Sequence, residues 1–390
     1  MELSQGYKQT HIGIIPLDWD VLKFTDCADL KHGFQFREEH FSNDGIKVVK
    51  IGTLQYNGKL DFSSATFVDT TSLPKFSNFT LANGDVLMAL TGATLGKCSI
   101  VDSNEVLLQN YRVGNFFNKP RCIKNYVYLL LESDFIQKKF RKLVNEAAQP
   151  NIGKGDFDKF YVPLPPTLSE QTAIATTIAD ANDFIATLQK LITKKRNIKQ
   201  GAMQKLLQPK EGWEVKKLGE IFYITAGGDL DVQNFSMIKD EKYSFPIYSN
   251  ALTNKGLYGY TSEFRQNENT ITVTARGQVG VAIPRHHKYC AIGRVIMLNP
   301  KTQLDINFIT ECINNFIKFS NESTGVPQLT APKISKSEVT IPDVKEQTRI
   351  ASVLFDMDEE IISLETKLAK YRNIKLAMMQ NLLTGKIRLV

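Results

Sequence analysis

The stretch PTLSEQTAIATTIADANDFIATLQKLITKKRNIKQGAMQKLL, residues 166–207, occurs a second time in altered form as PDVKEQTRIASVLFDMDEEIISLETKLAKYRNIKLAMMQNLL, residues 342–383. The two stretches align without a gap, and 18 of their 42 positions are identical. The identical positions include a Glu-Gln pair near the start and the run Arg-Asn-Ile-Lys near the end. Agreement at this level indicates an internal duplication.

Both copies carry apolar residues at alternating steps of three and four, which places them in one narrow stripe on an α-helix. A single helix of this kind commonly packs on its own globular domain. The duplication changes this expectation, because each stripe offers the other a partner of the same period. We expect the two helices to pair through these residues, which include Ile178, Ile185, Leu188 and Ile192 in the first copy and Leu354, Ile361, Leu364 and Leu368 in the second.

Each helix follows a longer stretch that is rich in Val, Ile, Thr, Tyr and Phe, with Gly and Asn at turns, as expected for short strands joined by long loops. The sequence around Trp19 resembles that around Trp213, so these stretches also repeat, although more loosely. The sequence therefore predicts an α+β chain of four parts. They are module one (residues 1–165), a first helical spacer (166–208), module two (209–341), and a second helical spacer with a C-terminal tail (342–390).

The duplication also predicts a geometry. If the two copies pack in equivalent ways, the helices must pair as an antiparallel coiled coil with pseudo-two-fold symmetry. A helix of about 36 residues rises ~54 Å, which matches about 16 base pairs of DNA at ~3.4 Å each. Such a pair could hold the two strand-rich modules roughly a turn of DNA apart.

Composition narrows the class of partner. The formal net charge of +7 favours a polyanionic partner, although many basic proteins bind none. Apolar runs fall short of the ~18 residues that span a bilayer, and the N-terminus lacks the pattern of a signal peptide. The 5 cysteines form no Cys-x-x-Cys pair, which is typical of reduced thiols. We expect a cytoplasmic protein with no membrane partner.

The segment TGATLGKC, residues 91–98, raises the alternative of a nucleotide-binding loop. Such loops need four residues between their glycines and Ser or Thr after the Lys, whereas here three residues intervene and Cys follows. Module two has a counterpart, TARGQVGVA (residues 274–282), in which Ala275–Gly280 corresponds to Thr91–Gly96 and Val281 replaces Lys97. We therefore expect a structural glycine turn rather than a phosphate loop.

The sequence also lacks the residue patterns of a metal site or of a catalytic site. His286, His287 and Cys290 suggest zinc, but a second pair of ligands at ordinary spacing is missing and structural zinc sites need four. The five histidines and scattered acids support neither a Ser-His-Asp arrangement nor a paired-carboxylate site. We expect no metal site and no catalytic residue in this chain.

Taken in order, these features resemble the DNA-specificity subunit of type I restriction-modification systems. The resemblance covers essentially the whole chain and rests on the Pro and Trp that begin each module, the glycine turns, the Pro and Glu-Gln that begin each helix, the RNIK runs and the terminal LLTGKIRL. It implies that each module is a target-recognition domain that binds one half of a split, asymmetric site in double-stranded DNA. The helical pair would set the gap between the halves and dock two modification subunits.

The resemblance also implies where the catalysis lies. The modification subunits would methylate adenine at N6 with S-adenosylmethionine, and restriction subunits would add ATP-driven translocation and cleavage, with Mg²⁺. The chain itself would hold no cofactor and would not be an enzyme. Two rival interpretations remain: a fragment of a fused methyltransferase and endonuclease, which would bind S-adenosylmethionine, and a coiled-coil scaffold unrelated to DNA, whose DNA association would be weak and insensitive to salt.

Loop residues near the glycine turns are the candidates for contact with DNA, because Arg and Lys suit guanine and phosphate, Asn and Gln suit adenine, and aromatic rings suit thymine. In module one they are Arg37, Gln55, Tyr56, Lys59, Lys97 and Arg112; in module two they are Asn250, Tyr258, Tyr260, Arg276, Gln278 and Arg294. The duplicated residues Arg196, Asn197, Arg372 and Asn373 are the candidates for subunit docking, because two equivalent docking surfaces require equivalent residues.

Overall fold

The computed structural model describes residues 5–146, 149–319 and 328–389. The chain forms two compact units, and the boundaries between them fall inside the long helices. Unit 1 comprises Met1–Gln189 and Thr366–Val390, and unit 2 comprises Lys190–Glu365. Each unit therefore contains one module together with parts of both long helices.

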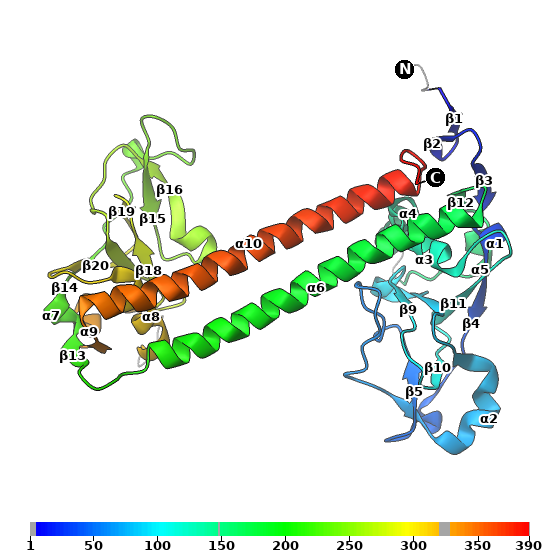
Figure 1. Ribbon diagram of the computed structural model, residues 1–390, viewed down its shortest axis with the longest axis horizontal. Helices are drawn as coiled ribbons and strands as arrows, with labels where there is room; N and C mark the ends of the chain where they lie inside the picture. Colours follow the sequence, from blue (N-terminus) through cyan, green and yellow to red (C-terminus); the bar gives the residue numbers. More distant parts are fainter. Residues whose placement is uncertain (1–4, 147–148, 320–327, 390) are drawn as a thin grey trace. The chain divides into compact units, whose positions relative to one another are not determined.

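The two duplicated stretches form α6 (Leu168–Leu206) and α10 (Val344–Leu382), each of 39 residues (Figure 1). Each helix begins at a side-chain cap. The Thr167 hydroxyl accepts a hydrogen bond from the Glu170 amide at 3.1 Å, and the Asp343 carboxylate accepts one from the Glu346 amide at 3.0 Å. The predicted helices are confirmed, and the caps explain why both begin at equivalent residues.

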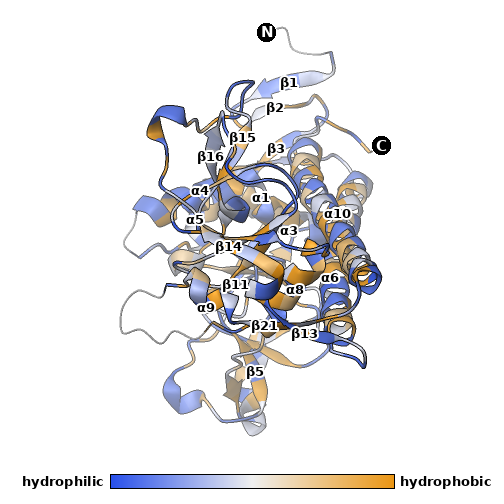
Figure 2. Ribbon diagram, turned by 90° about the vertical axis from the view of Figure 1, so that its left-hand side faces the viewer, coloured by the Kyte–Doolittle hydropathy of each residue, from blue (hydrophilic) through white to orange (hydrophobic). Residues whose placement is uncertain are grey.

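The helices pair in an antiparallel manner, as expected. In unit 1 the Phe184 ring of α6 packs on the Tyr371 ring of α10 with 4.4 Å between centroids. In unit 2 the later part of α6 meets the earlier part of α10, where Lys199 Nζ lies 2.5 Å from Asp358 Oδ1. Figure 2 shows hydrophobic and hydrophilic residues interleaved along both helices. Of the stripe residues, Ile178, Leu188, Ile192, Leu354 and Ile361 are buried and Ile185, Leu364 and Leu368 are half-buried.

Module one contains two four-stranded sheets, with the strand orders β4-β11-β8-β9 and β6-β5-β10-β7. Two-stranded sheets join β12 to β3 and β1 to β2. The strands are β1 (Tyr7–Thr10), β2 (Gly13–Pro16), β3 (Asp20–Lys23), β4 (Ala28–His32), β5 (Ile46–Val49), β6 (Phe67–Val68), β7 (Thr80–Leu81), β8 (Val86–Ala89), β9 (Cys98–Ile100), β10 (Leu107–Gln109), β11 (Val113–Asn118) and β12 (Tyr161–Leu164). The helices are α1 (Phe24–Cys27), α2 (Leu73–Phe76), α3 (Lys124–Glu132), α4 (Asp134–Glu146) and α5 (Lys154–Phe157).

Module two repeats this plan. Its larger sheet has the order β14-β20-β17-β18, its second sheet the order β16-β15-β19, and a two-stranded sheet joins β13 to β21. The strands are β13 (Glu214–Lys217), β14 (Phe222–Ala226), β15 (Phe245–Tyr248), β16 (Leu257–Thr261), β17 (Thr270–Val273), β18 (Ala282–Arg285), β19 (Cys290–Ala291), β20 (Ile296–Pro300) and β21 (Glu338–Ile341); the helices are α7 (Leu218–Ile221), α8 (Ile306–Phe316) and α9 (Ala331–Ser335). In both modules one parallel pair, β5 with β10 and β15 with β19, lies in the second sheet.

A buried glutamine fixes each module to the helix that follows it. In unit 1 the Gln171 side chain accepts a hydrogen bond from the Ile123 amide at 3.0 Å, just before α3, and donates one to the Arg121 carbonyl at 2.9 Å. In unit 2 the Gln347 side chain accepts from the Asp305 amide at 3.0 Å, just before α8, and donates to the Pro342 carbonyl at 2.9 Å. The repeated Gln therefore ties each long helix to the first residues of a module helix.

The repeated Lys of the RNIK runs faces a module carboxylate in each unit. In unit 1, burial raises the pKa of Glu132, at the end of α3, to about 7, while the positive charge of Lys375 opposes that rise. In unit 2, burial raises the pKa of Glu311 in α8, and Lys199 opposes it. Each module thus meets the start of one long helix through Gln and the end of the other through Lys.

The C-terminal tail closes unit 1. Arg388 forms an ion pair with the buried carboxylate of Glu170 and a second with Asp18 at 3.0 Å. Its guanidinium lies 5.7 Å from the ring of Trp19, which is fully buried. This explains why the residues after the second helix belong to the same unit as the N-terminal strands.

A charge placed in the helix stripe should destabilise the protein. Replacement L188D buries an unpaired carboxylate and should lower the free energy of unfolding by about 3 to 5 kcal/mol. The control L191D lies one turn away on the exposed part of α6 and should change it by less than about 0.5 kcal/mol. Denaturant unfolding of both variants measures the difference, and equal stabilities would show that the stripe does not join the helices.

The half-buried carboxylate of Glu132 should make stability depend on pH. Because its pKa in the folded chain is about 7 and its ordinary value is 4.5, its contribution is fully present below pH 4.5 and is lost as the pH rises through 7. The groups that face it are Lys375, Cys98 and Tyr128. Replacement E132Q should remove up to about 3 kcal/mol of this pH dependence. Thermal unfolding between pH 5 and 8 tests this, and an unchanged slope would contradict it.

Candidate nucleic-acid interface

Three loops meet in each module beside the sheet that contains β8 and β11 in module one and β17 and β20 in module two. The first follows the parallel strand β5 or β15, the second is the glycine turn after β8 or β17, and the third leads into β11 or β20. Strands from both sheets position them, so residues far apart in sequence become neighbours.

In module one the structure brings together Gln55, Tyr56, Lys59 and Lys97. The Ser99 hydroxyl accepts a hydrogen bond from the Gln55 amide at 3.3 Å and donates one to the Lys59 carbonyl at 2.9 Å, which ties their turn to β9. Lys97 Nζ lies 4.5 Å from the centroid of the Tyr56 ring, which is 79% exposed. A cation over an exposed ring presents both a charge for phosphate and a flat apolar face for a base or sugar.

The other two module-one candidates lie at the edges of this group. The Arg112 carbonyl accepts a hydrogen bond from the Leu90 amide at 2.9 Å, which places Arg112 beside the glycine turn. Its exposed guanidinium donates to the Tyr111 hydroxyl at 2.6 Å. Arg37 is exposed and immediately precedes the short 3-10 helix η1 (Glu38–His40), a different segment from the one that carries Tyr56.

In module two one side chain joins the three loops. Asn250 Oδ1 accepts hydrogen bonds from the Ala275 amide at 2.7 Å and the Arg276 amide at 3.3 Å, and Asn250 Nδ2 donates to the Gly293 carbonyl at 2.6 Å. Arg276, Gln278 and Arg294 are exposed on the loops held in this way. Module two therefore gathers four of its six candidates.

Tyr258 and Tyr260 lie elsewhere, on the edge strand β16. The Tyr258 ring packs on Phe235 with 5.6 Å between centroids, and the Tyr260 backbone pairs with Ser236. Tyr258 is 46% exposed and Tyr260 is half-buried. These tyrosines extend the candidate surface along the second sheet rather than joining the loops around Asn250.

The glycine turns are built by close packing. Gly96 has a φ of +84° and Gly280 a φ of +89°, and a Cβ atom would lie 2.5 Å from Phe140 at the first position and would collide with Phe319 at the second. The expected alignment of Thr91 with Ala275 is wrong by one residue, because Thr91 pairs with Asn151 where Arg276 pairs with Gln328. Two residues rather than three separate the glycines in module two, so the shorter turn shifts the register.

Two residues that shape the module-two surface, Arg285 and Lys255, are not predicted from the sequence. Arg285 is buried, lies 3.5 Å from the Tyr248 ring centroid, and donates to the Lys255 carbonyl at 2.7 Å, and its burial lowers its pKa. Lys255 and its neighbour Asn254 adopt positive φ, which is uncommon outside glycine. Arg285 is followed by His286, His287 and Lys288, so the sequence around it resembles an exposed basic segment and carries no signal of its burial.

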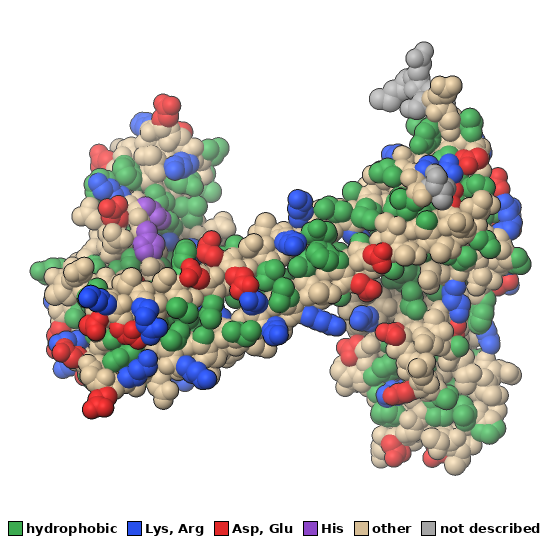
Figure 3. Space-filling model, viewed as in Figure 1, with side chains coloured by type: hydrophobic (Ala, Val, Ile, Leu, Met, Phe, Trp, Pro, Cys, Tyr) green, Lys and Arg blue, Asp and Glu red, His purple; other side chains and the backbone are tan. Residues whose placement is uncertain are grey.

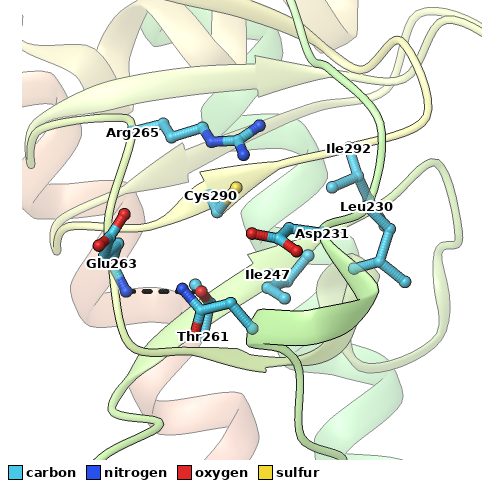
Figure 4. Close-up of a pocket in the computed structure, with 9 residues that line it drawn as sticks. Leu230, Asp231, Ile247, Thr261, Glu263, Arg265, Cys290 and Ile292 are labelled. Carbon is cyan, nitrogen blue, oxygen red and sulfur yellow. Dashed lines mark hydrogen bonds between the residues drawn. The ribbon is translucent and has the colours of Figure 1, made fainter.

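The zinc alternative finds no support in the arrangement of these side chains. His286 contacts Asn269 and Asn307, and His287 Nε2 lies 2.8 Å from the Tyr248 hydroxyl. Cys290 instead lines a small hollow between Arg265 and Asp231 (Figure 4). Within residues 5–146, 149–319 and 328–389, no group of three or more His, Cys, Asp or Glu side chains is placed to hold a metal ion.

The docking candidates lie on the helix pair. Arg196 forms an ion pair with Glu365 at 2.5 Å, whereas the side chains of Asn197, Arg372 and Asn373 are exposed. At the position of Glu365 the two helices differ: α10 has Glu365 where α6 has Gln189. Figure 3 shows Lys, Arg, Asp, Glu and hydrophobic side chains interspersed along these helices.

In the described part of the chain, none of the helices is both long and apolar enough to cross a membrane.

Two repeated α+β modules, each presenting loops with exposed basic residues and each joined to the paired helices, define the class of protein: a duplicated scaffold that presents two sets of loops. The sequence profile of the family described as "Type I restriction modification DNA specificity domain" matches residues 16–198 and 210–371. The chain belongs to this family.

Individual relatives agree with the family assignment. The type I restriction enzyme MjaVIII specificity subunit of Methanocaldococcus jannaschii is 29% identical over 53% of this chain and 49% of its own length, so that match spans about half of that relative. The putative MjaX specificity subunit of the same organism is 25% identical over 99% of this chain and 97% of its own length.

Solved structures show the same fold. The crystal structure of the type I restriction-modification system S subunit from M. genitalium superposes with a TM-score of 0.67 at 17% identity, covering 98% of each chain. A structure described as the basis of complex assembly and conformational transition of the type I R-M system gives a TM-score of 0.59 at 15% identity, covering 96% of this chain and 99% of that chain. The predicted architecture of two strand-rich modules and a paired helical spacer is confirmed.

Proposed function

We propose that this chain is the subunit that gives a type I restriction-modification enzyme its DNA specificity, with each module reading one half of a bipartite, asymmetric site. The observation that carries the proposal is the repetition of one loop framework with different exposed residues. Module one presents Lys97 over Tyr56, whereas module two presents Arg276 and Arg294 around Asn250. Equivalent loops with different donors and acceptors suit two different short sequences.

The helix pair is the second part of the proposal. Its antiparallel pairing and the Gln contacts to each module support a role in setting a fixed unspecified gap. We assign the docking of two modification subunits to its exposed surface, including Asn197, Arg372 and Asn373. Arg196 contributes less directly, because its guanidinium is paired with Glu365. Restriction subunits would join the same assembly.

In this proposal the chain directs catalysis and does not perform it. S-adenosylmethionine, ATP and Mg²⁺ would belong to the modification and restriction subunits. The assembly would work in the cytoplasm, where chromosomal DNA lies. Binding of S-adenosylmethionine by the isolated chain would favour the alternative of a fused enzyme.

Co-expression of the chain with its modification subunit, followed by mapping of N6-methyladenine across the host DNA, tests the function. We expect one motif made of two short specified halves around a fixed gap. Methylation of a continuous motif, or none from a complex that forms normally, would contradict the proposal.

A single cation should contribute measurably to the DNA contact. Replacement K97A should weaken binding by a similar factor for different sequences and reduce the slope of log affinity against log salt by about one, because one phosphate contact is lost. K23A is the matched control, since Lys23 is exposed on β3 away from the three loops. Titration of each variant complex with target DNA at several salt concentrations gives the slope of log affinity against log salt. Equal slopes for K97A and K23A would show that Lys97 does not contact a phosphate.

A further inference from the structure

Asn250 has the side chain expected of a residue that reads adenine, yet its amide is committed within the protein. Its oxygen accepts from the Ala275 and Arg276 amides, and its nitrogen donates to the Gly293 carbonyl. An Asn side chain has one oxygen acceptor and two N–H donors. Reading adenine needs both ends of the amide at once, so these bonds leave Asn250 poorly suited to that task.

The three bonds lie directly beside the exposed guanidinium groups of module two. Arg276 is bonded through its own amide, and Arg294 follows Gly293 in the chain. Gly293 has a φ of +67° and Arg294 a φ of +69°. A left-handed conformation is unfavourable for Arg and persists only where the surroundings hold it. The bond from Asn250 to Gly293 is one such restraint, and the Gly293 amide adds another by donating to the Gly228 carbonyl at 2.9 Å.

In module one a different asparagine also binds the backbone of an exposed arginine. There the Asn110 side-chain oxygen accepts a hydrogen bond from the Arg112 amide at 3.2 Å, and Asn110 is buried. Arg112 lies immediately before β11, and Arg294 lies two residues before β20. In both modules an asparagine side chain therefore holds the backbone at or next to an exposed arginine, where the chain enters the corresponding strand.

We infer that Asn250 is a positioning residue for DNA recognition: it fixes the loops that carry Arg276 and Arg294 so that their guanidinium groups meet the half-site of module two. This inference rests on the proposed function and deepens it. Preorganisation of this kind lowers the conformational freedom lost on binding, so its removal loosens several contacts together.

The test uses the complete chain in complex with its modification subunit and a library of DNA sites with single-base changes. Variants N250A, N250D, R276A and R294A are compared by the fraction of each site that becomes methylated. N250A should lose the contributions of both arginines, with discrimination or affinity for the module-two half-site falling about tenfold or more. The module-one half-site is an internal control and should be read as in the unchanged chain.

N250D separates the two contacts. A carboxylate still accepts from the Ala275 and Arg276 amides but cannot donate to the Gly293 carbonyl, so N250D should resemble R294A and not R276A. N267A is the matched control, because Asn267 is exposed in the same module, and it should leave both half-sites unchanged. Thermal unfolding identifies any variant that merely fails to fold, and in that case N250D carries the comparison.

Two results would overturn the inference. One is an N250A complex that methylates as the N267A complex does. The other is a loss confined to a single base position that neither R276A nor R294A affects, which would make Asn250 a direct reader. If the unchanged chain yields no two-part motif, the proposed function itself fails, and that outcome is visible before any variant is compared.

Discussion

Two buried glutamine side chains hold the architecture together. Each glutamine amide has partners at both ends: its oxygen accepts from a backbone amide just before a module helix, and its nitrogen donates to a carbonyl, that of Arg121 for Gln171 and that of Pro342 for Gln347. A buried amide left without such partners would be costly. Within each unit they fix the module against the long helix that follows it. The reading loops stand on the same modules, so their orientation relative to that helix depends on these bonds.

The same framework carries two different surfaces. The sheets β4-β11-β8-β9 and β14-β20-β17-β18 have equivalent strand orders, and both glycine turns are packed under a phenylalanine, Phe140 in one module and Phe319 in the other. The side chains above them differ: Lys97 with Tyr56 in module one, and Arg276 with Arg294 in module two. The elements that position the loops are thus shared by the two modules, whereas the exposed residues differ, which is what the proposed asymmetric site would require.

The sequence predicted the helix pair well because its signal is local and repeated. The three-four spacing and the shared Glu-Gln and RNIK runs predicted the two long helices and their antiparallel pairing, and α6 and α10 lie within the predicted spacers. The grouping of Gln55 and Lys59 with Lys97 depends on Ser99, which bonds across 40 or more residues. Pairings of that kind leave no periodic pattern in a single sequence.

Residue roles were harder to predict than residue positions. The amide chemistry of Asn250 predicts contact with a base, but its hydrogen bonds within the protein join three loops that are distant in the sequence. The duplication predicts a docking role for Arg196, but Glu365, 169 residues away, pairs with it. The burial of Arg285 is not predicted, because its neighbours in sequence resemble those of an exposed basic segment.

The central claim is that the modules read independently while the helices set the gap. Replacing residues 209–341 with the corresponding module of another family member, and mapping N6-methyladenine in cells that also express the modification subunit, tests it most directly. The account predicts that one half of the methylated motif changes while the other half and the length of the gap stay the same. A change in both halves together would contradict it.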